Sequence, residues 1–393
     1  MSETRRLLVG NLGCEAEFGG RPLKLAVERT ISLFATALRA FAADGDELWT
    51  PALVPEERVA DVPGLARPKL LSGSLSRLRP SRVLAWCSSA SVTGLCKPCG
   101  QREPALNRAV APSSLRAASL LWEIPAAAPL AAARANHRSF ALESAEALGV
   151  KLEGAALLRS VSELERHLAL TATGSSPSGA WVLKAPYSTS GRDRVRSQGA
   201  LVSEAVRGSV ERLFKASGEV LFEPWLDRTA DFGVCAVVAP GFLHVFPPHE
   251  LEVDSRGSFR GIRLRSTTLS PAERSLLDST ANGVAGRLRI MGYSGPFGID
   301  AWRHRDRDGR ERFHPLGEIN ARMTFGLVAR ALEERLVDVG RIPGSSSLRL
   351  RFGKGAELER QTQVSPELIP LVSPLGPASE AVWVEICSQR PTG

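Results

Sequence analysis

The chain has 393 residues, of which 43% are hydrophobic and 23% are charged, and its net charge is +8. These values are typical of a soluble globular protein of two or three domains, because a single core rarely grows beyond about 250–300 residues. No apolar run reaches the roughly 18–20 residues that span a membrane, which argues against an integral membrane protein.

The basic start of the chain does not resemble a signal peptide, because Glu15 and Glu17 interrupt the apolar run that follows it. We therefore expect a cytoplasmic protein. The arginines are scattered and few aromatic residues lie among them, so compositional bias explains the positive charge better than a nucleic-acid partner does. Small phosphorylated ligands are the expected anionic partners.

The cysteines leave one question open. Cys96 and Cys99 form a C-x-x-C pair close to Cys87. Such a pair can hold zinc or undergo redox chemistry, but structural zinc needs four ligands and the chain has no second C-x-x-C. Buried thiols are the favoured interpretation.

The N-terminal third alternates strands and helices. Residues 7–13 predict a buried strand, residues 24–43 a helix that ends at Asp44-Gly45-Asp46, and residues 47–54 and 83–86 two further strands. This order predicts a small α/β domain up to about residue 130. The segment contains neither G-x-G-x-x-G nor the P-loop GK[ST], so nucleotide sites of those kinds are not supported.

A hydroxyl-rich loop follows the next predicted strand. After a joint at residues 125–135, Asn136 is the expected N-cap of a helix that ends at Gly149, and a second helix covers residues 161–170. The strand WVLK then brings Lys184 to the start of the loop PYSTSGRDR. Such a loop can wrap a phosphate, although a plain turn is the alternative.

Residues 220–238 predict a β-hairpin with a turn at Asp227-Arg228. The backbone after Glu223 could offer a donor and an acceptor to an adenine edge. Farther along, alternation in residues 259–265 places Arg263 and Arg265 on one strand face. Ser270, Pro271 and Glu273 predict the start of a helix that ends at Gly292.

Residues 292–326 combine a predicted hairpin with acidic side chains. Asp308-Gly309 marks the turn, and Glu318 and Asn320, two positions apart, share one strand face that Asp300 can meet from the partner strand. Two carboxylates and an amide oxygen suit Mg²⁺, which also takes phosphate oxygens and water. The alternative is a surface hairpin with solvent-facing acids.

The histidines add no further ligands to this picture. His304 and His314 flank the charged turn and are expected at the surface. A helix at residues 323–339 and a strand pair around residues 348–352 and 381–386 complete the predicted elements.

The order of these motifs carries a family resemblance. Over about residues 131–339 the chain resembles the ATP-grasp superfamily of carboxylate–amine ligases. The resemblance rests on five motifs in this order: an N-x-R helix, V-L-K-x-P-x-S-x-x-G-R, F-E-P-W-L-D, G-x-D and E-I-N-A-R. The resemblance implies an α/β protein, α+β in its catalytic part, with an ATP-grasp fold after a small Rossmann-like domain. The implied boundaries are 1–130 for the N-terminal domain, 131–225 for the small subdomain and 226–393 for the large one.

The resemblance also implies a role for each matching residue. Lys184 would contact the ATP phosphates and adenine, Ser188, Ser190 and Gly191 would belong to the flexible phosphate loop, and Arg138 stands where the family usually has a lysine. The remaining implied positions are the adenine and hinge residues Glu223, Trp225 and Leu226, the ribose candidates Asp227 and Asp231, the Mg²⁺ ligands Asp300, Glu318 and Asn320, and Arg322 beside the reacting oxygens. Some relatives carry an arginine where Gly298 stands, which leaves Arg322, or Arg263 and Arg265, to stabilise the intermediate.

The implied activity is ATP- and Mg²⁺-dependent joining of a carboxylate to an amine through an acyl phosphate, with small amino-acid or peptide-like substrates. An ATP-grasp kinase, another synthetase, and a nucleotide- or nucleic-acid-binding protein without turnover are the alternatives. The oligomeric state stays open, with a homodimer among the alternatives.

Overall fold

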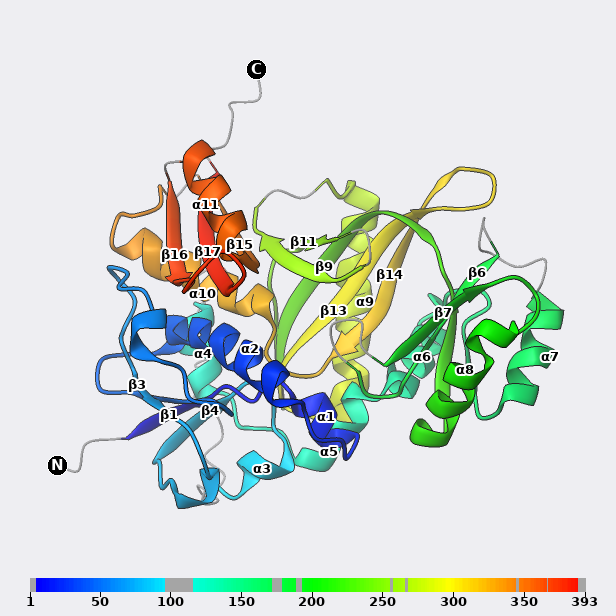
Figure 1. The fold of residues 1–393 in the computed structure, drawn as a ribbon, viewed down its shortest axis with the longest axis horizontal. Coiled ribbons are helices and arrows are strands. Elements are labelled where there is room, and N and C mark those ends of the chain that lie inside the picture. Colours follow the sequence, from blue (N-terminus) through cyan, green and yellow to red (C-terminus); the bar gives the residue numbers. More distant parts are fainter. Residues whose placement is uncertain are drawn as a thin grey trace.

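The computed structural model describes residues 5–95, 116–171, 179–188, 193–254, 257–265, 268–343, 346–365 and 367–387. Three sheets organise these residues, with helices packed against them (Figure 1). The mixed α/β architecture agrees with the sequence prediction. Within the described part of the chain, no helix combines the length and apolar character that crossing a bilayer requires.

The N-terminal sheet is parallel and has the strand order β3-β2-β1-β4. Its strands are β1 (Arg6–Val9), β2 (Glu47–Trp49), β3 (Lys69–Leu71) and β4 (Arg82–Ala85). The surrounding helices are α1 (Cys14–Phe18), α2 (Leu25–Ala35), η1 (Thr36–Phe41), η2 (Glu56–Arg58), η3 (Leu75–Arg77), α3 (Ala90–Thr93) and α4 (Ala117–Glu123). The predicted helix at 24–43 is present as α2 continued by η1, whereas α1 and β3 are too short to show a periodic pattern.

The second sheet has the order β5-β8-β6-β7 and is antiparallel. Its strands are β5 (Ala156–Leu158), β6 (Ala180–Lys184), β7 (Arg194–Gln198) and β8 (Val220–Pro224). α7 (Val161–Thr171) and α8 (Glu204–Ser217) pack on this sheet. α5 (Pro129–Asn136) and α6 (Arg138–Ala147) pack instead against β9, β13 and β14 of the third sheet. Apolar side chains of β6, β8, α7 and α8 form a separate small core.

The third sheet contains nine strands in the order β14-β13-β9-β11-β12-β15-β17-β16, with β10 paired to β9. The strands are β9 (Asp227–Ala239), β10 (Phe242–Val245), β11 (His249–Val253), β12 (Phe259–Arg263), β13 (Gly295–Arg305), β14 (Glu311–Asn320), β15 (Ser347–Lys354), β16 (Leu368–Val372) and β17 (Glu380–Cys387). Its helices are α9 (Pro271–Ile290), α10 (Phe325–Asp338) and α11 (Gly355–Val364). The predicted pairing of β15 with β17 is confirmed.

Two local predictions were wrong. Residues 220–238 are not a hairpin, because β8 belongs to the second sheet and β9 to the third, so the chain crosses between sheets after Pro224. Asn136 is not an N-cap: it ends α5, and His137 caps α6 by accepting from the backbone N–H of Ser139. The alanine-rich joint at 125–135 is itself largely helical, since alanine has the highest helix propensity.

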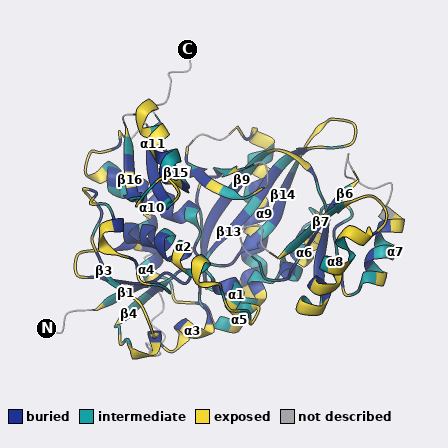
Figure 2. Cartoon of the chain, viewed as in Figure 1, coloured by how far each residue is buried: buried dark blue, intermediate teal, exposed yellow. Residues whose placement is uncertain are grey.

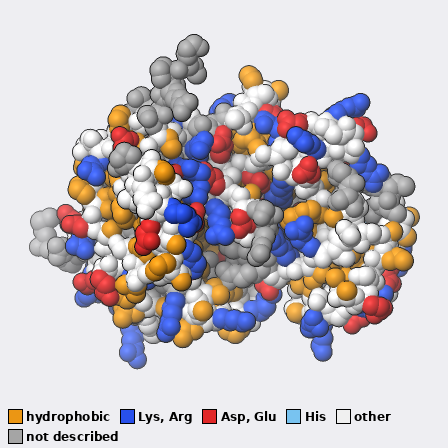
Figure 3. All heavy atoms as spheres, turned by 45° about the horizontal axis from the view of Figure 1, so that its top comes forward, with side chains coloured by type: hydrophobic (Ala, Val, Ile, Leu, Met, Phe, Trp, Pro, Cys, Tyr) orange, Lys and Arg blue, Asp and Glu red, His pale blue; other side chains and the backbone are white. Residues whose placement is uncertain are grey.

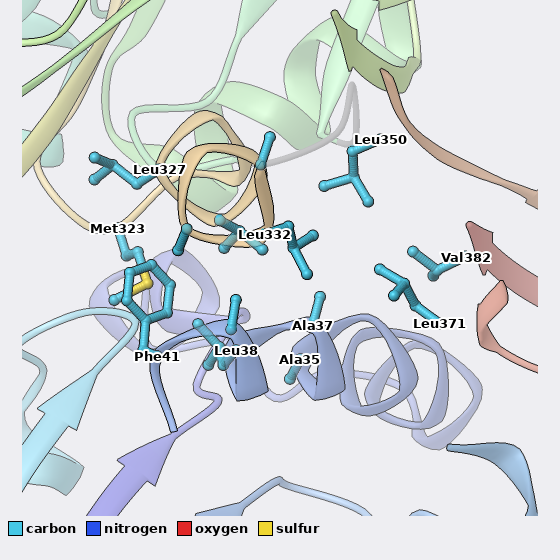
Figure 4. Close-up of a cluster of buried hydrophobic side chains, with 14 of the residues drawn as sticks. Ala35, Ala37, Leu38, Phe41, Met323, Leu327, Leu332, Leu350, Leu371 and Val382 are labelled. Atoms are coloured by element: carbon cyan, nitrogen blue, oxygen red, sulfur yellow. The ribbon is translucent and has the colours of Figure 1, made fainter. Parts of the chain in front are cut away.

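The main core joins the N-terminal region to the last strands of the chain. α2, η1 and α10 pack together with the strands β15 to β17 (Figure 1). Leu38, Phe41, Leu332, Leu371 and Val382 meet in one buried cluster (Figure 4). Burial is likewise concentrated in the strands of the central sheet (Figure 2). N-terminal and C-terminal segments therefore share one core.

Candidate functional site

The predicted acidic hairpin exists, and its acids face each other. β13 and β14 are antiparallel, with Asp300 opposite Glu318 and Gly298 opposite Asn320. Gly309, at the tip of the turn, has a φ of 74°, which a glycine adopts without strain. Asp300, Glu318 and Asn320 line one cavity of about 610 Å³ together with Arg138, Ser188 and Arg322. The cavity lies between helix α2 and the nine-stranded third sheet.

The facing carboxylates influence each other's charge. Burial, followed by the nearby charge of Glu318, raises the pKa of Asp300 to about 7, while Arg322 and Arg228 oppose the shift. A like charge close by disfavours ionisation, and a cation between the two groups would relieve the repulsion.

Two arginines contact the Glu318 and Asn320 side chains. Arg138 Nη1 lies 3.2 Å from Glu318 Oε2, and its Nη2 donates to Ser188 Oγ over 3.0 Å. Arg322 Nη2 donates to Asn320 Oδ1 over 2.8 Å, and its Nε contacts Glu15 Oε1 at 2.6 Å. Burial would lower the pKa of the Arg322 guanidinium, but Glu15 raises it, so the positive charge is firmly held.

The backbone at the C-terminal end of β14, after Asn320, is held by hydrogen bonds from α5. Asn136 Nδ2 donates to the carbonyl of Ala321 over 3.0 Å, and the N–H of Ala321 donates back to Asn136 Oδ1 over 3.0 Å. This paired contact holds the backbone between Asn320 and Arg322, so the side chain that sequence patterns suggested as a cap instead orders the site.

Lys184 and Glu223 occupy a second, narrow pocket next to the first. Their side chains form a buried ion pair between β6 and β8. Burial lowers the pKa of Lys184. Burial would raise the pKa of Glu223, but Lys184 outweighs it and the pKa lies below its ordinary value. Trp225, Leu226, Arg228 and Trp302 also line this pocket.

The aromatic walls of the narrow pocket are held by close packing. The guanidinium of Arg196 lies 3.5 Å from the ring centre of Trp225, and that of Arg228 lies 3.6 Å from the ring centre of Trp302. A Cβ at Gly317 would stand 1.6 Å from the Trp302 ring, so only glycine permits this approach. The pocket thus combines aromatic walls with a buried ion pair, and its volume of about 10 Å³ holds about one water molecule.

Other predicted residues lie elsewhere. Asp227 is exposed, and Asp231 pairs with Arg228 at 3.0 Å. Arg265 pairs with Glu333 of α10 at 2.8 Å, and neither Arg263 nor Arg265 lines the cavity. The arginine of β12 that does line it is Arg260.

Several predictions fall on residues outside the described part of the chain. Ser190, Gly191, Cys96 and Cys99 are among them, while Cys87 is buried. His304 and His314 are described and are not surface residues: they are 8% and 6% exposed, since strands β13 and β14 turn them inward. Burial lowers the pKa of both.

Sequence reasoning missed Glu15, Arg228 and Trp302. Glu15 follows the glycines of the loop after β1, and such loops frequently bring backbone and short helices close to a ligand. Arg228 directly follows Asp227, and Trp302 lies two residues after Asp300. No sequence pattern indicated the role of Arg228 or Trp302.

The protein itself supplies only some of the oxygen ligands that a hard divalent cation needs. Among the described residues, no group of three or more His, Cys, Asp or Glu side chains is placed to hold a metal. Asp300 and Glu318 supply two carboxylates and Asn320 an amide oxygen, as Mg²⁺ prefers when phosphate and water complete its shell.

Positive side chains surround this region at the surface. Lys and Arg side chains gather along the hollow in the middle of the molecule (Figure 3). Arg138, Arg260 and Arg322 line the cavity itself. An anionic ligand approaching the hollow would be attracted by this charge.

No family model matches the chain, and no curated protein sequence matches it. Solved structures do. N5-carboxyaminoimidazole synthetase from Staphylococcus aureus, complexed with ADP, has a TM-score of 0.56 at 11% identity and covers 98% of this chain and 94% of its own. N5-carboxyaminoimidazole synthase from Aspergillus clavatus, in complex with ADP and 5-aminoimidazole ribonucleotide, has a TM-score of 0.52 at 11% identity and covers 99% and 95%.

A third similar structure is the biotin carboxylase domain of 2-oxoglutarate carboxylase from Hydrogenobacter thermophilus, a dimer with MgADP, ADP and bicarbonate. Its TM-score is 0.53 at 11% identity, with 97% of this chain and 86% of the other covered. These similarities span the N-terminal domain and both later sheets, and they establish the fold. The fold expected from the motif order is confirmed.

Proposed function

We propose, because the chain has the ATP-grasp fold, that it is an ATP- and Mg²⁺-dependent ligase that joins a small carboxylate to an amine. One observation carries the proposal: Asp300, Glu318 and Asn320 converge in a single cavity with two arginines. This combination is suited to phosphoryl transfer, where positioning and charge neutralisation do most of the work.

Each described side chain has a task in this proposal. Asp300, Glu318 and Asn320 would hold Mg²⁺, which when bound neutralises phosphate charge. Lys184 and Arg138 would hold the ATP phosphates beside Ser188, and the backbone from Glu223 to Leu226 would meet the adenine edge. Arg322, with its charge kept by Glu15, would stabilise the negative charge that develops on the reacting oxygens.

The reaction proposed here has two balanced steps. A substrate carboxylate oxygen attacks the γ-phosphorus of ATP, so that an acyl phosphate forms and ADP leaves. The amine nitrogen then attacks the acyl carbon, phosphate leaves and the nitrogen loses a proton. Arg322 faces charge in both steps, because the phosphoryl oxygens and the acyl oxygen lie at the same end of the cavity.

The proposal is tested by measuring phosphate release from Mg-ATP with pools of small acids and amines, with hydroxylamine added to trap the acyl phosphate. Glu318→Gln should reduce turnover at least about 100-fold, because it removes a charge from the proposed metal site. Glu311→Gln, at the exposed start of the same strand, is the matched control and should stay active.

The folded state of both variants is checked by their thermal unfolding. A fully active Glu318→Gln variant would remove this residue from the site. ADP formation with a phosphorylated product but no hydroxamate would indicate an ATP-grasp kinase instead.

A further inference from the structure

The large cavity has two chemically different ends. Its polar end carries Asp300, Glu318, Asn320, Arg138 and Arg322. Its other end is aromatic and is lined by Phe34 of α2, Phe259 of β12, Phe325 of α10 and Phe352 of β15. The ligase proposal uses only the polar end, and nothing in it explains the aromatic one.

The aromatic end is one continuous cluster. The ring centres of Phe325 and Phe352 are 4.4 Å apart, those of Phe34 and Phe352 are 5.0 Å apart, and those of Phe259 and Phe352 are 5.4 Å apart. Trp86 joins it to the polar end, because its ring lies 4.9 Å from Phe325 and 5.5 Å from the guanidinium of Arg322. A ligand at the Arg322 end can therefore extend directly onto aromatic surface.

The aromatic end lies on the side away from the proposed nucleotide pocket. Lys184, Glu223 and Trp225 line the separate narrow pocket, and within the described residues no part of β5 to β8 lines the large cavity. Its aromatic walls come instead from α2, β12, α10 and β15. The space there is consequently available to the substrate that receives the phosphoryl group.

The charges around the cavity disfavour a second phosphate at this end. Of the lining arginines, Arg138 and Arg322 belong to the polar end, and Arg260, next to Phe259, pairs with Asp254 at 2.9 Å. Glu380, also at the wall, pairs with Lys354 at 2.5 Å. A charged group buried against the phenylalanines would lose its hydration without gaining a partner.

Resting on the proposed function, we infer that the acyl donor is a carboxylic acid with a large apolar side chain, aromatic or branched. Its carboxylate lies at the Arg322 end and its side chain packs between α2 and the Phe259–Phe325–Phe352 wall. The amine enters from the open side of the cavity and is not selected by this wall.

The test uses hydroxylamine in place of the amine, so that only the acid is varied. Hydroxamate formation with Mg-ATP is compared for pairs of acids that differ in the polarity of the side chain: 3-phenylpropionate with succinate, phenylalanine with aspartate, and leucine with asparagine, which is close to it in size. The apolar member of each pair should have a kcat/KM about 10- to 100-fold higher, as expected for burying a side chain of that size.

One substitution checks that the preference comes from this wall. Ala26 is an exposed residue of α2 that lines the cavity and lies outside the core cluster, so Ala26→Arg adds a cation there without disturbing the core. It should lower kcat/KM for 3-phenylpropionate at least about 10-fold and raise it for succinate. Leu25→Arg, on the same helix at 57% exposure and outside the lining, should leave both values unchanged.

The outcomes separate this inference from the ligase proposal. Hydroxamate formed equally well from polar or phosphorylated acids would overturn the inference and leave the ligase proposal standing. ADP formation with none of the acids would count against the ligase proposal, and calorimetry with ADP present would then decide the cavity preference. Binding of 3-phenylpropionate but not succinate would support it, and equal binding would overturn it.

Discussion

Lys184 and Glu223 are a buried ion pair whose members need each other. Both side chains are largely buried, at 14% and 9% exposure, so each carries a desolvated charge balanced by the other. In the proposed function Lys184 also meets the ATP phosphates. Lys184→Met should therefore weaken ATP binding about 10-fold or more, and calorimetry measures this directly.

Loss of a partner leaves Glu223 uncompensated, so the variant should also be less stable. The double variant Lys184→Met/Glu223→Gln is the control, because it removes both charges together. It should recover stability but not ATP affinity. Recovered affinity would show that Lys184 acts only through Glu223.

Glu15 of α1 contacts Arg322, which follows β14, and in the proposed function it positions the guanidinium. It contacts Arg322 at 2.6 Å from α1 and is 5% exposed. Glu15→Gln keeps the shape and removes the charge, so Arg322 should lose its fixed orientation. We expect kcat to fall about 10-fold or more with a much smaller change in KM for ATP, because the interaction matters most for charge that develops during reaction.

Glu17→Gln is the matched control on the same short helix. Glu17 bonds to Ser91 at an exposed position and does not line the cavity. Its kinetic constants should stay at their original values. A fall in stability alone for Glu15→Gln, with kcat intact, would give the residue a structural role only.

At the scale of elements, the N-terminus of α9 is specified by a local sequence motif. Ser270 accepts from the backbone N–H of Glu273, and Glu273 accepts from the backbone N–H of Ser270, which forms a capping box. Arg303 of β13 adds a bond to Glu273 Oε2 at 2.8 Å. The side-chain bond from Arg303, aided by Ser270, lowers the pKa of Glu273 to about 2 from 4.5.

The sign of the pH effect follows from that lowered pKa. The stabilisation is fully present above the unfolded value of 4.5 and is lost as pH falls toward about 2. Glu273→Gln should cost about 1 kcal/mol of unfolding free energy at pH 7. In urea unfolding, the difference from the original protein should shrink as pH is lowered below 5. Asp278→Asn on the same helix should have little effect at either pH.

The elements that sequence predicted well are those whose signals are local. The capping box of α9, the hairpin of β13 and β14 and the opposition of Asp300 to Glu318 all follow from residue order and period. The hairpin expected at 220–238 failed for a different reason. Nothing local distinguishes a turn within a sheet from a crossing between sheets, so only the tertiary partners of β8 and β9 decide it.

The site residues also fall into those that local sequence patterns could indicate and those that only the tertiary structure brings in. Residues on one hairpin could be grouped from sequence, whereas Glu15, Asn136 and Arg138 reach it from other elements. Arg263 and Arg265 were predicted to share a strand face, but Arg265 lies beyond the end of β12 and turns to Glu333. The aromatic end of the cavity draws its phenylalanines from four elements, which no motif could reveal.

At the scale of the whole molecule, the N-terminal segment and the C-terminal strands share one hydrophobic core. Arg58 of η2 donates to the backbone of Ser373 at 2.5 Å and of Glu380 at 2.7 Å, which ties the first domain to β16 and β17. Around this contact, Phe41 and Val382, at 1% and 0% exposure, belong to one buried cluster (Figure 4). The sheet formed by β5 to β8 has a core of its own.

This arrangement predicts how unfolding is distributed. Phe41→Ala should cost about 3–5 kcal/mol, because it leaves a cavity in the shared core. Since that core includes the last strands, hydrogen exchange should accelerate in β15 to β17 as much as in β1 to β4. Leu164→Ala, in the separate core under the second sheet, should accelerate exchange in β6 and β8 and leave β17 protected. If Phe41→Ala loosened only residues 5–95, that segment would be an independent folding unit. Its contact with Arg322 through Glu15 could then be broken without unfolding the third sheet.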